Sequence, residues 1–441
     1  MKKTATTAIL LLGLLVNAAR SQNPSGAFSR FVETFADEYR ALDIPWVDFD
    51  YQEYLRQIPS LREIEKREEW LRQYREQLAG FDTSAFSPAE YRTFRHLRYQ
   101  LDLHLERCLL EKKFKSRGPA AIPADGLSRL PGGAEWYRFY IRYATGVAIS
   151  PDEIFEYGMA ELKKVRQQMH LIQLKEGFVM DTAAWWKTLN EDRFFLTERD
   201  SVTAGYERIQ TRVLAHLDSL FEQAPDSVPD IGFMTWPNAG PYTPPGIYLS
   251  EDDNAYGKAV FQFNFYGNRH NRRAMDWLFL HEAIPGHHFH RYVRQQAPRD
   301  PLDGLWFAGG TVEGWATYVE YFGEAMGLYQ GNWERLGKWE WDLVRSARIV
   351  LSVGIHDRGW TKAGALAFWK ANVPNQDAIA EREVTRCINW PAQVLTYKIG
   401  AKKIMEMRRA AEERMGETFD VRRFHSWFLS AGYVPLAVLE G

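Results

Sequence analysis

The chain has 441 residues, of which 45% are hydrophobic and 25% are charged, and its net charge at pH 7 is −2. These values are ordinary for a soluble globular protein, and the balance of charges argues against nucleic acid as a partner. The length allows two or three domains, although large helical enzymes of this size also form one unit.

The first 21 residues have the features of a signal peptide. Two lysines give a positive start, an apolar run covers residues 9–16, and Val16–Ala18 or Ala19–Ser21 suits a signal peptidase. No cysteine stands near this segment, which argues against a lipid anchor. The rest of the sequence has no apolar run long enough to span a bilayer. We therefore expect a mature protein, residues 22–441, that is periplasmic or secreted.

The sequence has two cysteines, Cys108 and Cys387, which lie far apart. An oxidising compartment permits a bridge between them, and two buried free thiols are the alternative. Neither belongs to a CxxC motif, so no thiolate zinc site is expected.

Residues 22–228 show the pattern of consecutive amphipathic helices. Ser87-Pro88 and Ser150-Pro151 each give a serine cap followed by a proline in the first turn, which is a common start of a helix. The charge runs in this half indicate solvated helix faces. The predicted helices cover residues 25–42, 61–78, 88–114, 151–174 and 197–223.

The composition changes between Pro229 and Gly267, where prolines and glycines gather. Apolar residues alternate over 246–249 and 260–266, which predicts short strands. This small β-structured segment directly precedes the most unusual stretch of the chain. A role beside that stretch and an ordinary hairpin over the core are both open.

The stretch from Leu278 to His290, LFLHEAIPGHHFH, holds four of the chain's 11 histidines beside one glutamate. Its apolar neighbours indicate a core rather than a solvated tail. In the short HExxH form, two histidines at i and i+4 bind zinc, and the glutamate is the general base. Here His287 comes six residues after His281, about 9 Å away along an unbroken helix.

A break at Pro285-Gly286 would remove this separation. Proline takes away a backbone donor and glycine tolerates unusual dihedral angles. A local bulge in a helix predicted over 273–294 would thus bring His287 back to the face of His281. His288 lies on that face of a straight helix, but about 10.5 Å away. It stays open as the second ligand, and otherwise we expect it to support the site.

The rest of the chain is predicted to be helical, with one segment that supplies a third ligand. Catalytic zinc takes three protein ligands and keeps one position open. Glu313 is the best candidate, because Gly314 and Ala316 keep its helix slim enough to approach closely. Glu320 lies two turns later on the same face and is expected to support a ligand. The predicted helices cover residues 311–326, 332–357, 362–371, 377–389, 392–415 and 421–429.

These motifs resemble the DUF885 family, a bacterial family allied to the gluzincin zinc metallopeptidases. HEAIPGHH is followed by Glu313–Ala316, and further matching blocks lie at 354–361, 391–400 and 424–441. The resemblance is specific from about residue 240 to the C-terminus. It implies a mainly α, multi-helix body with a deep cleft. It also implies that the β-structured segment lies beside the metal-binding helix and pairs with an extended substrate.

The resemblance implies further roles around the metal. Tyr397 and His356 lie in matching blocks, and gluzincins commonly use a tyrosine or a histidine to stabilise the tetrahedral oxyanion. Arg386 is a candidate for holding a substrate carboxylate through its planar fork. With no clear linker, we expect one domain that consists of an N-terminal helical half, 22–228, and a metal-site half, 229–441.

The expected function is hydrolysis of short or flexible peptides with one zinc ion per chain and with Glu282 as general base. The peptide substrate follows from the resemblance. A zinc hydrolase of another amide or ester is one alternative, since its ligands would be identical. A peptide-binding relative without turnover is the other, and Glu282 argues against it because a binder needs no base.

Overall fold

The computed structural model describes residues 24–118, 121–222, 227–298 and 300–440, and the predicted signal peptide lies outside them. The described chain is mainly α-helical with small sheets, which confirms the predicted fold class. It forms two compact units. Unit 1 comprises the described parts of residues 1–47, 59–117 and 299–306, and unit 2 comprises those of 48–58, 118–298 and 307–441. The limits of these units do not coincide with the predicted boundary at residue 228.

Unit 1 is built from three helices, α2 (Pro24–Ala41), α4 (Leu61–Ala79) and α5 (Pro88–Ser116). The Ser87 hydroxyl accepts a hydrogen bond from the backbone N–H of Glu90, and the Glu90 carboxylate accepts one from the backbone N–H of Ser87. Helix α5 therefore begins where its serine and proline predict. Helices α4 and α5 pack against each other. The core is apolar and rich in aromatic rings, with Phe28, Phe35, Leu71, Leu97 and Leu101 fully enclosed.

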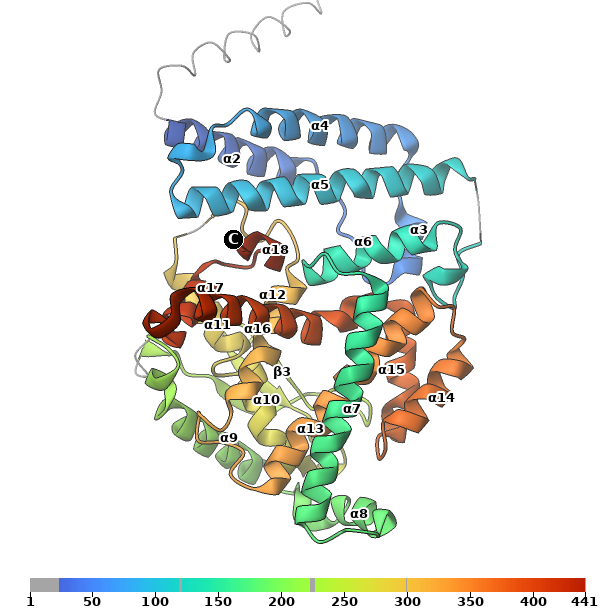
Figure 1. Ribbon diagram of the computed structural model, residues 1–441, viewed down its shortest axis with the longest axis vertical. Helices are drawn as coiled ribbons and strands as arrows, with labels where there is room; N and C mark the ends of the chain where they lie inside the picture. Colours follow the sequence, from blue (N-terminus) through green and yellow to red (C-terminus); the bar gives the residue numbers. More distant parts are fainter. Residues whose placement is uncertain (1–23, 119–120, 223–226, 299, 441) are drawn as a thin grey trace, which may run out of the picture. The chain divides into compact units, whose positions relative to one another are not determined.

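The central element of unit 2 is α13 (Asn332–His356), which is buried along most of its length. Helix α7 (Pro151–Lys175) lies along it, as Figure 1 shows, and α10 (Met275–Glu282) and α15 (Asp377–Asn389) also pack on it. From Leu336 to its end, nearly all residues of this helix are buried. The charged side chains that it carries there therefore need partners inside the unit.

Helix α12 (Gly309–Val319) packs closely against α16 (Thr396–Met415). A Cβ atom at Gly314 would lie 2.6 Å from the backbone of Gly400, so neither helix tolerates a side chain at this crossing. The predicted slim helix is therefore present. The close crossing brings the start of α16 next to Glu313.

A three-stranded sheet lies beside α10. Strand β2 (Gly232–Thr235) runs parallel to β4 (Val260–Phe263), and β3 (Gly246–Leu249) pairs with β4 on its other side in antiparallel register. The order β2-β4-β3 leaves β3 at an edge. This agrees with the predicted β-structured segment, to which the structure adds β2.

Most predicted helices are present with small shifts at their ends, and four differ. The helix predicted over 273–294 is two helices, α10 and α11 (His287–Gln296), because the backbone leaves the helical conformation at Ala283 and Gly286. The helices predicted over 197–223, 311–326 and 392–415 are shorter, since each range contains a 3-10 turn toward one end. The other helices of unit 2 are α3 (Tyr51–Gln57), α6 (Gly133–Thr145), α8 (Thr182–Leu189), α9 (Arg199–Leu214), α14 (Lys362–Asn372), α17 (Val421–Ser430) and α18 (Leu436–Leu439), and a two-stranded sheet joins β1 (Phe195–Leu196) to β5 (His270–Asn271).

The structure bears on the two cysteines and on membrane-spanning helices. Cys108 and Cys387 are free, buried thiols, so of the two alternatives the structure has the unbridged one. Among the described residues, no helix combines the length and apolar character needed to cross a bilayer.

Candidate functional site

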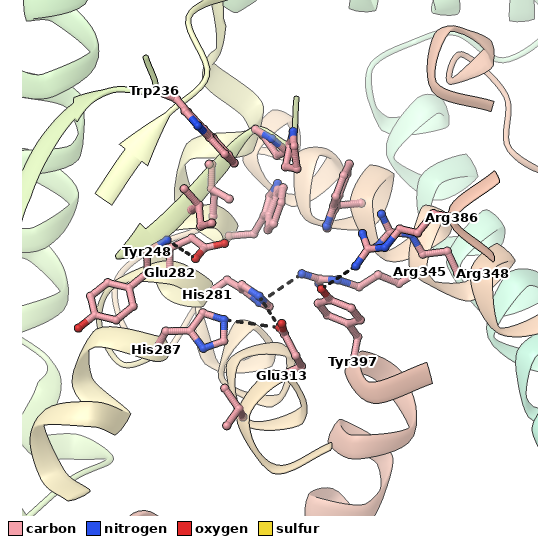
Figure 2. A pocket seen from close by; sticks show the side chains of 18 of the residues that line it. Trp236, Tyr248, His281, Glu282, His287, Glu313, Arg345, Arg348, Arg386 and Tyr397 are labelled. Carbon is pink, nitrogen blue, oxygen red and sulfur yellow. Dashed lines mark hydrogen bonds and ion pairs between the residues drawn. The ribbon is translucent and has the colours of Figure 1, made fainter. Parts of the chain in front are cut away.

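A cavity of about 780 Å³ in unit 2 collects most of the predicted site residues. Its lining residues include members of β3, α10, α11, α12, α13, α15 and α16, and Figure 2 labels ten of the side chains around it. Its chemically active lining residues are Trp236, Tyr248, His281, Glu282, His287, Glu313, Arg345, Arg348, Arg382, Arg386 and Tyr397.

The break between α10 and α11 brings the two histidines together. Gly286 packs directly on the carbonyl oxygens of Leu280 and His281, where any Cβ atom would collide with the backbone. Only glycine permits this return of the chain. As a result, the rings of His281 and His287 stand 4.9 Å apart and nearly perpendicular.

Glu313 on α12 completes a group that could hold a metal ion. One ligand atom from each of His281, His287 and Glu313 lies within 4.8 Å of the others. Oε2 of Glu313 is 3.4 Å from Nε2 of His281 and 3.5 Å from Nε2 of His287. Ligand atoms on a tetrahedral zinc, with bonds of about 2.0–2.1 Å, lie about 3.3 Å apart. The separations on Glu313 therefore fit such an ion.

The charges at this point also fit a cation. Oε2 of Glu313 is buried and, among the described residues, has no hydrogen-bond partner. Burial opposes its charge, yet the imidazoles of His281 and His287 hold the pKa of Glu313 well below its usual range. Burial likewise lowers the pKa of His281, but Glu313 and Glu320 raise it to about 9. The negative charges of Glu313 and Glu320 thus favour a positive charge at this position. A bound divalent cation would supply that charge in place of the proton on His281.

His281 is oriented from behind by a buried ion pair. Its Nδ1 lies 2.8 Å from Oε1 of Glu320, and Nη1 of Arg345 lies 2.7 Å from both oxygens of that carboxylate. A carboxylate on one ring nitrogen directs the other nitrogen, here Nε2, toward a metal. The structure thus places Glu320 where the sequence predicts a supporting group, and adds Arg345.

Glu282, the last residue of α10, lies beside the group and is bound to the sheet. Its Oε2 accepts the backbone N–H of Tyr248 at 2.8 Å. Burial raises the pKa of Glu282 above its ordinary value, against the opposing effect of His281 and His287. A carboxylate with a raised pKa, fixed through one oxygen, suits a group that accepts a proton.

Tyr397 and Arg386 face the same space from the opposite wall. The Tyr397 ring is nearly parallel to that of His281, with 6.1 Å between centres. Nη2 of Arg386 donates to the Tyr397 hydroxyl at 3.3 Å and to Oε1 of Gln393 at 2.7 Å. Because the hydroxyl accepts from Arg386, its own proton is left to donate.

His356 is not brought to this cavity, and the role predicted for it is withdrawn. Its Nδ1 accepts the N–H of Leu127 at 3.0 Å, and its Nε2 lies 2.7 Å from the carbonyl of Cys387. Burial lowers the pKa of His356 to about 4. A neutral ring with both nitrogens bonded to backbone has no donor for an oxyanion.

His288 also lies outside the metal group. Its Nε2 lies 2.8 Å from the carbonyl of Pro229, and its Nδ1 lies 3.4 Å from the hydroxyl of Tyr248. It therefore ties α11 to the sheet and supports Tyr248 rather than a ligand. Of the two candidates for the second histidine, His287 is the one that the structure brings to His281.

Sequence reasoning missed the cationic wall of the cavity. Arg345 and Arg348 on α13, and Arg382 on α15 beside Arg386, all line it. One signal was present: the two α13 arginines interrupt an otherwise apolar run, LVRSARIVL. A buried arginine needs a partner, so such a pattern marks an internal polar site.

Comparisons with known proteins add a family and a fold. The family described as "Bacterial protein of unknown function (DUF885)" matches residues 107–441. A "putative lipoprotein" from Colwellia psychrerythraea is 23% identical over 86% of this chain and 69% of its own, with a TM-score of 0.65. A "putative lipoprotein of unknown function" from Shewanella oneidensis is 18% identical over 88% of this chain and 74% of its own, with a TM-score of 0.59. No curated protein matches this chain.

Proposed function

The chain belongs to the DUF885 family, and we propose that it is a metal-dependent hydrolase, specifically a zinc peptidase of the gluzincin kind that cleaves short or flexible peptides. One observation carries the proposal: a ligand atom from each of His281, His287 and Glu313 lies within 4.8 Å of the others, in the wall of a cavity that also holds Glu282. Two imidazoles and a carboxylate are a common ligand set of catalytic zinc.

The roles of the protein groups follow from their contacts. When bound by His281, His287 and Glu313, zinc supplies Lewis-acid activation of water and of the scissile carbonyl. Oε2 of Glu282 is held by the Tyr248 amide, so its Oε1 takes the proton of the attacking water. Glu282 then returns that proton to the leaving nitrogen.

The edge strand β3 is the proposed support for the substrate backbone. The backbone N–H of Asn264 donates to the carbonyl of Pro245. In an antiparallel pair every second residue hydrogen-bonds to the neighbouring strand, so the backbone groups of Gly246 and Tyr248 point away from β4. The hydrogen bond from the Tyr248 amide to Glu282 agrees with this orientation. The outward carbonyls beside Glu282 are acceptors for an extended peptide.

Tyr397 is the proposed donor to the oxyanion. In Tyr397→Phe we expect the turnover number to fall about 100- to 1,000-fold, as on loss of one oxyanion donor, with little change in KM. Steady-state kinetics on one peptide measures this, and metal analysis checks that the site is still loaded. An unchanged turnover number would remove Tyr397 from the mechanism.

The proposed compartment is the periplasm or the exterior of the cell, because residues 1–21 have the charge and apolar pattern of a signal peptide. The N-terminal sequence of the protein isolated from a periplasmic or culture fraction tests this. An intact N-terminus on cytosolic protein would reject it.

A combined metal and peptide assay tests the function. We expect the purified protein to contain close to one zinc ion per chain. It should cleave members of a peptide library, lose cleavage after dialysis against a chelator, and regain it with added zinc. Bound zinc with cleavage of esters or non-peptide amides alone would favour the other hydrolase. Bound zinc with no turnover would favour a binding protein, and failure to bind any divalent ion would reject all three.

A further inference from the structure

The wall of the cavity opposite β3 carries more positive than negative charge. Arg348 donates its Nε to Oε2 of Glu383 at 2.5 Å, and Nη2 of Arg382 donates to Oε1 of the same carboxylate at 2.5 Å. Glu383 is fully buried. Both of its oxygens are therefore used, and one negative charge is shared by two guanidinium groups.

Arg386 adds a further charge to this wall. Its Nη2 donates hydrogen bonds to the neutral side chains of Gln393 and Tyr397, and among the described residues it forms no ion pair. Its Nε is buried and has no hydrogen-bond partner. A guanidinium in this position has unused donors, and it is ionised at any ordinary pH.

The other charged groups that line or flank the cavity have contacts elsewhere. Arg345 is paired with Glu320, and Arg291 is paired with Glu251 and Asp252. Glu313 lies against the two imidazoles of the metal group, Glu282 accepts the Tyr248 amide, and Asp253 accepts the Ser250 hydroxyl. On their own side of the cavity, the three side chains Arg348, Arg382 and Arg386, which we call the arginine wall, therefore carry more positive charge than Glu383 balances. Such a surplus favours an anionic ligand.

The Tyr397 ring lies near both the arginine wall and the metal group. The Tyr397 ring centre lies 6.0 Å from Cζ of Arg386, 5.9 Å from Cζ of Arg348 and 6.1 Å from the ring centre of His281. In Figure 2, Tyr397 lies next to His281 and is joined to Arg386 by a dashed line. An extended chain advances about 3.4 Å per residue. This gap accommodates about one to three residues of a peptide.

We propose that the arginine wall binds a carboxylate of the peptide substrate, with Arg386 as its principal contact. The substrate class is then short peptides with a free carboxylate about one to three residues from the scissile bond. A chain-terminal carboxylate and the side chain of a terminal Asp or Glu share this chemistry. The position of the scissile bond rests on the proposed function, whereas the binding of the carboxylate does not.

Binding to the zinc-loaded Glu282→Gln variant separates recognition from cleavage. The probes are an N-acetylated hexapeptide of Ala and Phe with a free C-terminal carboxylate, the same acetylated peptide as its C-terminal amide, and an acetylated and amidated peptide that ends in Glu. By calorimetry, we expect at least one of the two anionic peptides to bind about 10- to 100-fold more tightly than the neutral amide. The anionic peptide that binds more tightly identifies the source of the carboxylate. Equal binding of all three peptides, or binding of none, overturns the inference.

Substitutions at Arg386 assign the preference to the wall. Arg386→Gln should abolish the preference, so that the affinity for the anionic peptide falls to that for the neutral amide. Zinc content and the thermal unfolding midpoint of the variant serve as the check of folding. Arg386→Lys keeps the positive charge but loses the planar guanidinium, so it should retain part of the preference for the anionic peptide. Arg409→Gln, at an exposed position of α16, removes the same charge and is the matched control. A preference that survives in Arg386→Gln overturns the inference.

Failure of the proposed function gives a different result. A wild-type protein that cleaves no peptide but prefers anionic peptides in an Arg386-dependent way would reject the peptidase and support the arginine wall. Cleavage of the neutral amide as fast as of the anionic peptides would support the peptidase and overturn the wall.

Discussion

Glu282→Gln is expected to lower the turnover number about 100- to 10,000-fold while the protein keeps its metal. The side chain is not among the three that converge on the metal position. Its Oε2 accepts the Tyr248 amide at 2.8 Å, and the oxygen of a glutamine can accept the same bond. The substitution therefore removes the proton acceptor and leaves the surrounding structure in place. Zinc content and single-turnover cleavage of one peptide, measured on the same preparation, check both halves of the expectation.

Asp253→Asn is the matched control for this experiment. Asp253 lines the same cavity but takes no part in the proposed chemistry. The same loss of charge there should change the turnover number by no more than a few-fold. If Glu282→Gln retains full activity, the general base lies elsewhere. Loss of zinc together with activity would instead make Glu282 a ligand.

The local part of the site could be predicted from sequence, because its signals are local. His281 and Glu282 are adjacent, and the proline and glycine before His287 predict a break in the helix. Glu313 is followed by Gly314 and lies near Ala316, and its choice as third ligand rested on these small neighbours, on the rule that zinc takes three ligands and on the resemblance to the family. How far the chain turns at the break could not be predicted, since it depends on the packing of Gly286 against carbonyls in α10.

The role suggested for His356 failed because sequence does not say which way a buried side chain faces. The block around His356 matches the family, and the residue is fully buried. Its partners, the Leu127 amide and the Cys387 carbonyl, are 229 and 31 residues away in the chain. Contacts between residues so far apart in the chain depend on tertiary packing, so they cannot be predicted from a local sequence pattern.

Helix α6 (Gly133–Thr145) was missed for a different reason. Its polar side chains Glu135, Arg138 and Arg142 lie along one side, and the remaining positions are mostly buried. The contrast between an apolar and a polar face, from which amphipathic helices are recognised, was therefore present in the sequence. Its N-terminus at Gly132 lacks a side-chain cap. The serine-and-proline start that marked α5 and α7 was thus absent here, and the helix was overlooked.

Glu320→Gln is expected to destabilise the metal-free protein by about 3–5 kcal/mol and to weaken zinc binding about 10- to 100-fold. Glu320 and Arg345 are each only 1% exposed. Arg345 donates to both oxygens of Glu320 at 2.7 Å, so the substitution leaves a buried guanidinium without the charge that balances it. It also removes the charge that holds Nδ1 of His281. Urea unfolding of the metal-free protein measures the first effect, and competition with a chelator measures the second.

The double variant Glu320→Gln/Arg345→Gln separates these two effects. With both charges gone, no guanidinium is left buried without a counter-charge, so much of the lost stability should return. Zinc affinity should stay low, because His281 still faces a neutral amide instead of a carboxylate. Full recovery of zinc affinity in the double variant would mean that Glu320 acts only by neutralising Arg345. Unchanged stability in the single variant would mean that other groups, such as the nearby Asp342, already balance Arg345.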